Sequence, residues 1–177
     1  MKKEVETIVE RIKEYAKMRP DNAAYIATHD SEEDVVVTNR DLEDTLQKLG
    51  YVLKNTNAQN NRVLVMYPPG LDYIEIVLAC FYVGYVAIPC YPFVQKTKDM
   101  IQNIIEDAKP GIIFSLGQDN DEYREFVKQN ESICFLTMSS FDENAPRAEA
   151  APVGQDDIAF LQYTSGSIGK SKGVMVT

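Results

Sequence analysis

The sequence has few of the residues that most often carry metal or nucleophilic chemistry. It contains one histidine, His29, and three cysteines, Cys80, Cys90 and Cys134, in 177 residues. The cysteines are odd in number and far apart, so they suggest neither a zinc site nor a redox pair, and we expect them to be reduced, as in a cytosolic protein. His29 begins the stretch His-Asp-Ser-Glu-Glu, which is typical of a turn. No metal site is therefore expected.

Basic clusters and long apolar runs are also missing. The formal net charge is -9, and the eighteen Lys and Arg residues are scattered. Without a basic footprint, nucleic-acid binding and a membrane-surface role are disfavoured. The longest apolar stretch, residues 74–89, is interrupted by Glu75 and Gly84 and is shorter than a bilayer span. Residues 1–6 contain no apolar signal core, so the expected location is the cytoplasm.

What the sequence does have is a regular alternation of helix and strand patterns. Hydrophobic residues make up 45% of the chain, enough for the core of one domain. Helical spacing predicts a first helix that ends before Pro20 and others over residues 42–53, 71–82, 97–108 and 119–129. Strands are predicted over residues 23–28, 34–38, 62–66, 86–89, 111–115, 132–137 and 158–163. The repeated strand–helix–strand units predict an α/β fold with a mostly parallel sheet flanked by helices.

Two local features refine this prediction. Thr38 and Asp41 have the spacing of a helix cap, which places a helix start between the second and third predicted strands. Residues 139–157 are rich in Ala, Pro, Glu and Asp and have no period. This segment is expected to be a loop over the surface.

The most informative segment is residues 163–173, Tyr-Thr-Ser-Gly-Ser-Ile-Gly-Lys-Ser-Lys-Gly. Glycines allow successive backbone N–H groups to turn toward one anion. The hydroxyls of Thr164, Ser165 and Ser167 can donate to phosphate oxygens, and lysine adds a mobile positive charge. The segment follows a predicted strand, which would hold its base in place. It predicts a phosphate-binding loop, and residues 164–173 are expected to be mobile without nucleotide.

Two other interpretations of this segment stay open at this point. Gly, Ser and Lys are common in turns, so a plain surface turn is one of them. The other is the P-loop of nucleotide triphosphatases, whose pattern residues 164–171 match except that Thr164 replaces the first glycine. A P-loop requires a helix starting near Gly169. The residues after Gly173, Val-Met-Val-Thr, favour a strand instead.

Residues 161–177 resemble the phosphate-binding signature of the adenylate-forming superfamily, Tyr-Thr-Ser-Gly-Ser-Thr-Gly-x-Pro-Lys-Gly-Val-Met. Residues 66–73, 79–92 and 104–110 are similar to fatty-acyl-AMP ligases in particular, above all at the proline-flanked Tyr91, so the resemblance covers most of the chain. Two positions depart from the signature, since Ile168 stands where the family usually has threonine and Ser171 where it usually has proline. The matching residues are Thr164, Ser165, Gly166, Ser167, Gly169, Lys172 and Gly173.

The resemblance implies that residues 1–177 are the N-terminal part of an AMP-binding (adenylation) domain, its first α/β subdomain, ending just after the phosphate-binding loop. The family activates a fatty acid with ATP and Mg²⁺, releases pyrophosphate, and passes the acyl group to the phosphopantetheine thiol of an acyl carrier protein. The seven matching residues would bind the β- and γ-phosphates of ATP. The catalytic lysine, the ribose contacts and the magnesium ligand would lie further along the chain, so these 177 residues alone are expected to be inactive.

Two further functions stay open. One is an acyl-CoA synthetase of the same superfamily, which differs in the thiol that accepts the acyl group. The other is a non-enzymatic α/β module.

Overall fold

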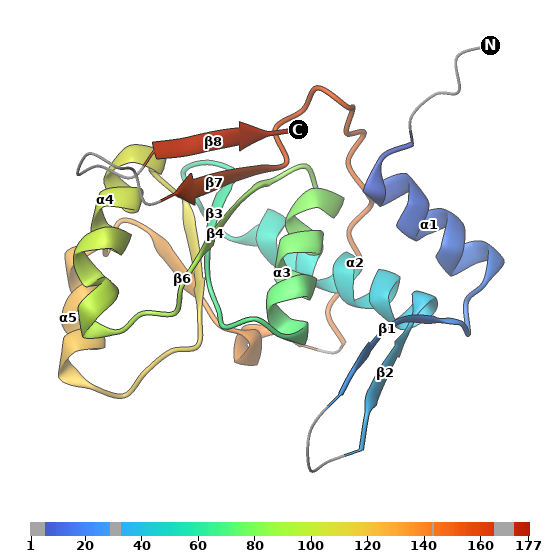
Figure 1. Cartoon of the computed structure of the whole chain (residues 1–177), viewed down its shortest axis with the longest axis horizontal. Helices are drawn as coiled ribbons and strands as arrows, with labels where there is room; N and C mark the ends of the chain where they lie inside the picture. Colours follow the sequence, from blue (N-terminus) through green and yellow to red (C-terminus); the bar gives the residue numbers. More distant parts are fainter. Residues whose placement is uncertain (1–5, 29–32, 143, 165–171) are drawn as a thin grey trace.

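A six-stranded sheet forms the centre of the molecule, with helices on both of its faces (Figure 1). The computed structural model describes residues 6–28, 33–142, 144–164 and 172–177. The strand order is β6-β5-β3-β4-β7-β8, and all neighbours are parallel except β7 and β8. The predicted α/β class with a mostly parallel sheet is therefore confirmed. The strands are β3 (Arg62–Met66), β4 (Val86–Cys90), β5 (Ile112–Ser115), β6 (Cys134–Leu136), β7 (Phe160–Thr164) and β8 (Lys172–Val176).

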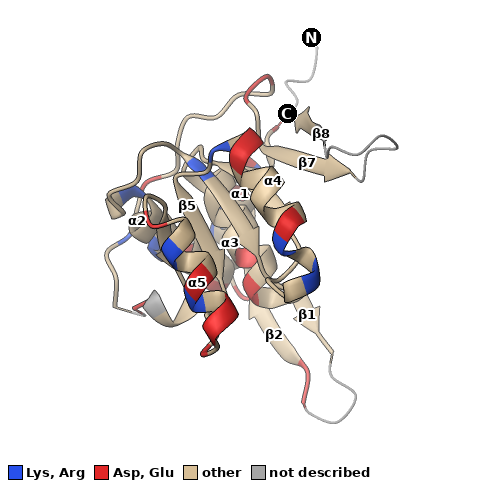
Figure 2. Ribbon diagram, turned by 90° about the vertical axis from the view of Figure 1, so that its left-hand side faces the viewer, with Lys and Arg blue, Asp and Glu red and all other residues tan. Residues whose placement is uncertain are grey.

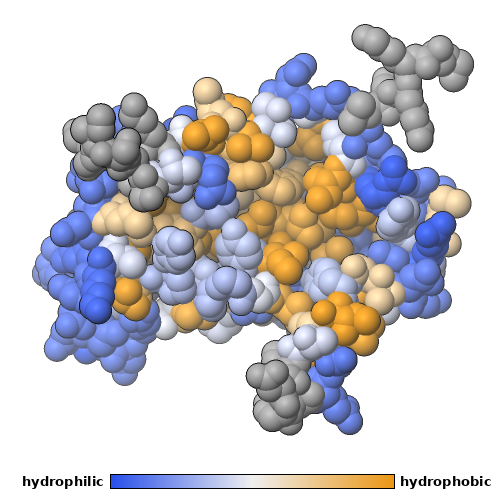
Figure 3. Space-filling view, viewed as in Figure 1, coloured by the Kyte–Doolittle hydropathy of each residue, from blue (hydrophilic) through white to orange (hydrophobic). Residues whose placement is uncertain are grey.

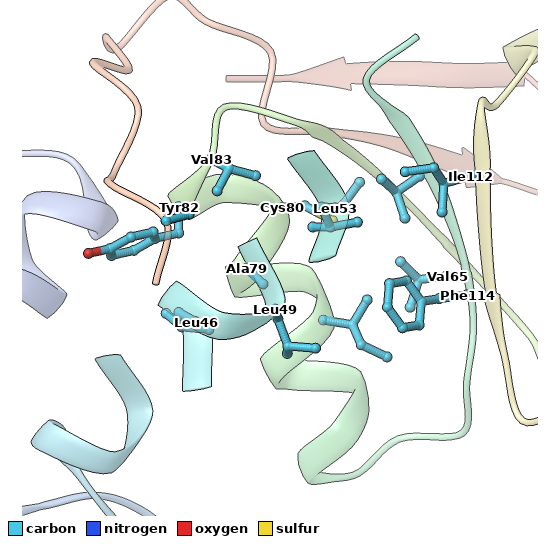
Figure 4. Packing of buried hydrophobic residues seen from close by; sticks show 14 of the residues in the cluster. Leu46, Leu49, Leu53, Val65, Ala79, Cys80, Tyr82, Val83, Ile112 and Phe114 are labelled. Atoms are coloured by element: carbon cyan, nitrogen blue, oxygen red, sulfur yellow. The ribbon is translucent and has the colours of Figure 1, made fainter. Parts of the chain in front are cut away.

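The central strands are buried on both faces, which explains why they are almost continuously apolar. Val63 and Val65 of β3 contact the side covered by α2 (Asn39–Asn55) and α3 (Leu71–Tyr82). The alternate residues Leu64 and Met66 contact the opposite side, covered by α4 (Lys98–Ala108) and α5 (Asp121–Gln129). Figure 4 shows the first of these cores, in which Leu46, Leu49 and Leu53 of α2 face α3 and the sheet. The two cores hold the parallel strands rigidly.

A second, two-stranded sheet precedes the main one. Helix α1 (Ile8–Met18) packs against α2, and β1 (Ala23–Ala27) pairs antiparallel with β2 (Val35–Thr38). The predicted cap is confirmed, because the Thr38 hydroxyl accepts a hydrogen bond from the Asp41 backbone N–H and Asp41 accepts one from the Thr38 N–H. In the part of the chain that the structure describes, no helix has the length and apolar character needed to cross a membrane.

The segment predicted as a surface loop is one, apart from the short 3₁₀ turn η2 (Met138–Ser140). Its middle is held against α2. The Ala148 N–H donates to the carbonyl of Gln47 over 2.9 Å, and Arg147 pairs with Asp44. Ala148 is buried as a result. This loop carries the chain from β6, at one edge of the sheet, back to β7 beside β4.

A half-buried carboxyl group links the small sheet to α3. The Tyr25 hydroxyl donates to Oε1 of Glu75 over 2.9 Å. Burial raises the pKa of Glu75 above its ordinary value of 4.5, with Asp72 adding repulsion and the bond from Tyr25 opposing the shift. The folded state thus holds the proton of Glu75 more tightly than the unfolded chain does.

We expect the free energy of unfolding to fall as the pH rises through the raised pKa of Glu75, because the favourable contribution of its neutral form is present below the ordinary value and is lost above the raised one. Replacing Glu75 with Gln keeps a hydrogen-bond acceptor for Tyr25 and removes the titration. Urea denaturation from pH 4 to 8 should show a flatter pH dependence for Glu75→Gln than for the parent. Superimposable pH profiles would contradict this assignment.

Candidate functional site

The glycine-rich segment lies between the last two strands. Strand β7 runs parallel to β4, with Phe160 opposite Ala87, and β8 returns antiparallel to β7. The two strands form a hairpin that lies beside α4 in Figures 1 and 2. The β-branched residues Val174 and Val176 favour the extended conformation of β8. The base of the loop is therefore attached on one side to a rigid parallel sheet.

Three of the seven predicted site residues fall on the described strands. Thr164 ends β7 and pairs directly with Lys172, which begins β8, so the two stems of the loop meet there. Gly173 is the next residue of β8 and lies opposite Tyr163. The other four predicted residues lie outside the described residues: Ser165, Gly166, Ser167 and Gly169. The expected mobility of residues 164–173 also concerns mainly residues outside the described part of the chain.

The element after the loop decides against the P-loop interpretation. That interpretation requires a helix starting near Gly169, whose N-terminal N–H groups would face the phosphates. The structure instead has strand β8 from Lys172 onward, paired over five residues with β7. The P-loop alternative is wrong. An anion bound here would have to be held by a strand–loop–strand hairpin.

Gly173 has a packing role that its place in the motif does not reveal. A Cβ atom added to this residue would lie 2.9 Å from the ring of Tyr163, which crosses the backbone of β8 at this point. Any side chain would therefore displace the tyrosine. The ring of Tyr163 itself packs against the core beneath α4 and α5. Glycine at position 173 thus allows the ring of Tyr163, on β7, to pack directly against the backbone of β8.

The hydroxyl of Tyr163 is hydrogen bonded to a carboxylate. It donates to Oδ2 of Asp107, in the last turn of α4. Burial, followed by this hydrogen bond, raises the pKa of Tyr163, while the nearby positive charge of Arg62 opposes the shift. Tyr163 therefore stays protonated and remains a donor at neutral pH. The sequence offered one signal for this contact, an aspartate at a helix C-terminus, where a negative charge is normally unfavourable.

A second group of polar residues lies at the carboxyl ends of the parallel strands. Tyr67 follows β3 and is buried, and its hydroxyl accepts a hydrogen bond from the Met138 N–H over 2.9 Å. Burial raises the pKa of this tyrosine. Ser115 ends β5 and is hydrogen bonded to the Tyr123 hydroxyl. Tyr91, the proline-flanked residue in the segment that resembles fatty-acyl-AMP ligases, follows β4 and is 70% exposed. Ligands of open α/β sheets commonly bind at this edge.

The structure also contains a cleft of about 950 Å³ between the start of α1, the end of α3 and the segment that leads into β7. Its lining is mostly apolar and includes Phe81, Tyr85, Val153 and Phe160. Figure 3 shows apolar surface gathered in this hollow. Thr177, at the far end of β8 from the loop, lies at its rim. The cleft is therefore separate from the loop end of the hairpin.

The described residues contain no group of three or more His, Cys, Asp or Glu side chains that could hold a metal ion. Cys80, Cys90 and Cys134 are free cysteines in this structure, and Cys80 is buried. Lys and Arg residues are interspersed with Asp and Glu residues along the ribbon in Figure 2, and α5 carries both signs.

The fold, a mostly parallel six-stranded sheet flanked by helices, matches the N-terminal domain of adenylate-forming ligases. The sequence profile of the family described as AMP-binding enzyme matches residues 12–177. The chain belongs to this family. The resemblance inferred from the loop motif and the upstream segments is thereby confirmed.

Several relatives are named as fatty-acid ligases. The chain is 26% identical, over 99% of its own length, to the medium-chain-fatty-acid–[acyl-carrier-protein] ligase JamA of Moorena producens. It is 24% identical over 97% of its length to fadD21 of Mycobacterium leprae, named as a fatty-acid–CoA ligase. The crystal structure of a fatty acyl-adenylate ligase from L. pneumophila, bound to acyl adenylate and pyrophosphate, superposes with a TM-score of 0.80 at 30% identity over 96% of the chain.

The match covers only part of each relative. The chain spans 31% of JamA, 31% of fadD21 and 30% of the L. pneumophila ligase. About two thirds of the length of each of those proteins is therefore not matched by this chain. The activity of a whole ligase is a proposal for this chain.

Proposed function

We propose that this chain forms part of a fatty-acyl-AMP ligase, an ATP-dependent acid–thiol ligase. The enzyme would join a fatty acid carboxylate to the α-phosphate of ATP, releasing pyrophosphate. It would then transfer the acyl group to the phosphopantetheine thiol of an acyl carrier protein, releasing AMP. The observation that carries the proposal is the 30% identity and TM-score of 0.80 to a ligase bound to acyl adenylate and pyrophosphate. Residues 1–177 would be the N-terminal part of its adenylation domain.

In this proposal the hairpin holds the phosphates and takes no covalent part. Thr164, Ser165 and Ser167 would donate hydroxyl hydrogen bonds, Gly166, Gly169 and Gly173 would allow close approach of the backbone, and Lys172 would supply positive charge. Donors fixed in advance around a leaving pyrophosphate stabilise the charge that develops during the reaction. The pairing of Thr164 with Lys172 supports this, because it brings a hydroxyl residue and a lysine to the same end of the hairpin.

The magnesium ligand of the proposed reaction is not assigned to the described part of this chain. ATP is used as its Mg²⁺ complex in this class of reaction, but the described residues supply no cluster of acidic ligands. We therefore assign no magnesium ligand to the described part of the chain and expect it elsewhere in the complete ligase. No catalytic residue is assigned within these 177 residues either.

The acceptor thiol is the main alternative within the proposal. JamA is named as a ligase for an acyl carrier protein, whereas fadD21 is named as a coenzyme A ligase. We favour the carrier protein because the segments around Tyr91 resemble fatty-acyl-AMP ligases. Cytoplasmic fatty acid metabolism, without a nucleic-acid partner or a membrane span, fits this role. Supplying the complete ligase with either coenzyme A or a carrier protein would decide between the two thiols.

The proposal is tested by adding Mg-ATP to the ¹⁵N-labelled 177-residue chain. We expect saturable chemical-shift changes at residues 164–173 and at their β-strand neighbours, and similar changes with pyrophosphate. Adenosine, which lacks phosphate, is the matched control and should leave these residues unchanged. If Mg-ATP and pyrophosphate leave residues 164–173 unperturbed at millimolar concentration, the segment is a plain turn and the proposed function is wrong.

A further inference from the structure

We propose that Tyr163 and Asp107 are positioning residues for the nucleotide phosphates, because together they fasten both stems of the loop to the end of α4. The inference rests on the proposed function, since it assigns a role within the same ATP site. Neither residue is among the predicted phosphate ligands. Their contribution would be to hold the hairpin in the orientation in which those ligands converge.

The fixed side of this contact is the last turn of α4. Arg62, at the start of β3, donates from Nη1 to the Ala108 carbonyl over 2.7 Å, and the Asn60 side chain donates to the Lys109 carbonyl over 3.0 Å. Lys109 adopts the left-handed conformation that ends the helix. The end of α4 is therefore tied to the central sheet through two separate side chains. An acceptor placed there is held close to the start of β3.

Asp107 is unusual in its position. A carboxylate in the last turn of a helix faces the negative end of the helix dipole, which is unfavourable. Asp107 is exposed, so its side chain is not needed to fill the core. The Tyr163 hydroxyl donates to its Oδ2, and this hydrogen bond offsets the unfavourable placement. A side chain that breaks a local rule and makes one specific contact points to a function for that contact.

The other side of the contact reaches both strands of the hairpin. Tyr163 belongs to β7 and immediately precedes Thr164, the first predicted phosphate ligand. Its ring crosses β8 at Gly173, immediately after Lys172. One side chain thus touches both stems within one residue of a predicted ligand on each side. Fixing the Tyr163 hydroxyl therefore fixes the two strand ends from which the predicted ligands extend.

Direct contact between these two residues and the phosphates is disfavoured by charge. The carboxylate of Asp107 would repel an anion, and the Tyr163 hydroxyl already donates to that carboxylate. Their effect would come from preorganisation, since a loop held in its binding orientation loses less conformational freedom when the nucleotide binds. This distinguishes a positioning role from a phosphate-binding one.

The chain contains a matched control for this contact. Tyr25 donates to Glu75, which is a second tyrosine–carboxylate hydrogen bond, located on the small sheet and α3. Tyr25→Phe and Tyr163→Phe each remove one hydroxyl and keep the ring. Only the second should affect the hairpin. Asp107→Asn retains an oxygen acceptor, whereas Asp107→Ala removes it.

The experiment measures the dissociation constant for Mg-ATP by calorimetry and the amide exchange of β7 and β8 in the 177-residue chain. Tyr163→Phe and Asp107→Ala should each weaken binding by about five- to tenfold, with little further loss in the double variant. Exchange should rise in β7 and β8 but not in β3 and β5. Asp107→Asn should bind more tightly than Asp107→Ala, and Tyr25→Phe should bind as the parent does.

Two failures can be told apart. If the parent chain binds no Mg-ATP, the proposed function is wrong and the positioning role falls with it. If the parent binds and Tyr163→Phe binds equally well, the phosphate site stands and the positioning role alone is overturned. A Tyr163→Phe loss that is matched by Tyr25→Phe also overturns it, because the effect would then reflect general stability. Thermal melting of each variant separates that case from a local change.

Discussion

Replacing Lys172 with alanine is expected to weaken Mg-ATP binding by about 10- to 150-fold, the worth of one hydrogen bond to a charged group. Lys172 aligns with the lysine of the Lys-Gly pair in the family signature, and its backbone begins β8 opposite Thr164. A positive charge at this stem would attract the β- and γ-phosphates, which carry most of the charge of ATP. Calorimetric titration of the 177-residue chain with Mg-ATP measures the loss directly.

Two other substitutions in the loop give this prediction a ranking. Lys170 stands at a variable position of the signature, so Lys170→Ala should have a smaller effect than Lys172→Ala. Ile168 stands where the family usually has threonine, so Ile168→Thr restores a hydroxyl donor and should tighten binding. If Lys170→Ala is the most damaging of the three and Ile168→Thr changes nothing, the alignment of the loop to the signature is wrong by its register.

Most of the fold was predictable because the relevant signals are local. The helix over residues 71–82 and the strand over residues 62–66 agree with α3 and β3, since turn residues bound both. The cap at Thr38 was readable from a three-residue spacing. The parallel arrangement followed from strands alternating with helices long enough to cross the sheet. The order of strands did not follow, because patterns along the chain do not say on which side of β3 each later strand adds.

The candidate site was predictable as a motif and only partly as a structure. Residue types in the loop indicate phosphate binding, and the β-branched residues after Gly173 correctly favoured a strand over a helix. The sequence does not show that β8 pairs antiparallel with β7. Nor does it show the contact of Tyr163 with Asp107, because the two residues are distant in sequence. The packing role of Gly173 could not be predicted either. A glycine that approaches a phosphate and a glycine that makes room for an aromatic ring look identical in a sequence.

Fatty-acid-dependent exchange of pyrophosphate into ATP is expected to be absent from the purified 177-residue chain, even where Mg-ATP binds. A loop that holds the phosphates and stabilises charge on the leaving pyrophosphate does not by itself bring the carboxylate to the α-phosphate. Acceleration requires groups that act on the α-phosphate and the carboxylate. The family resemblance assigns these to later parts of the ligase, and the chain spans only about 30% of its relatives.

The assay follows radiolabelled pyrophosphate into ATP with medium- and long-chain fatty acids. The L. pneumophila ligase, which the chain resembles over 96% of its length, is run beside it as the positive control. The signal from the 177-residue chain should equal that of its Lys172→Ala variant and of a blank without protein. Exchange above the blank that requires both fatty acid and Lys172 would place a complete active site within these residues. The hairpin would then act on the α-phosphate as well, and the assignment of its residues to the β- and γ-phosphates alone would have to be abandoned.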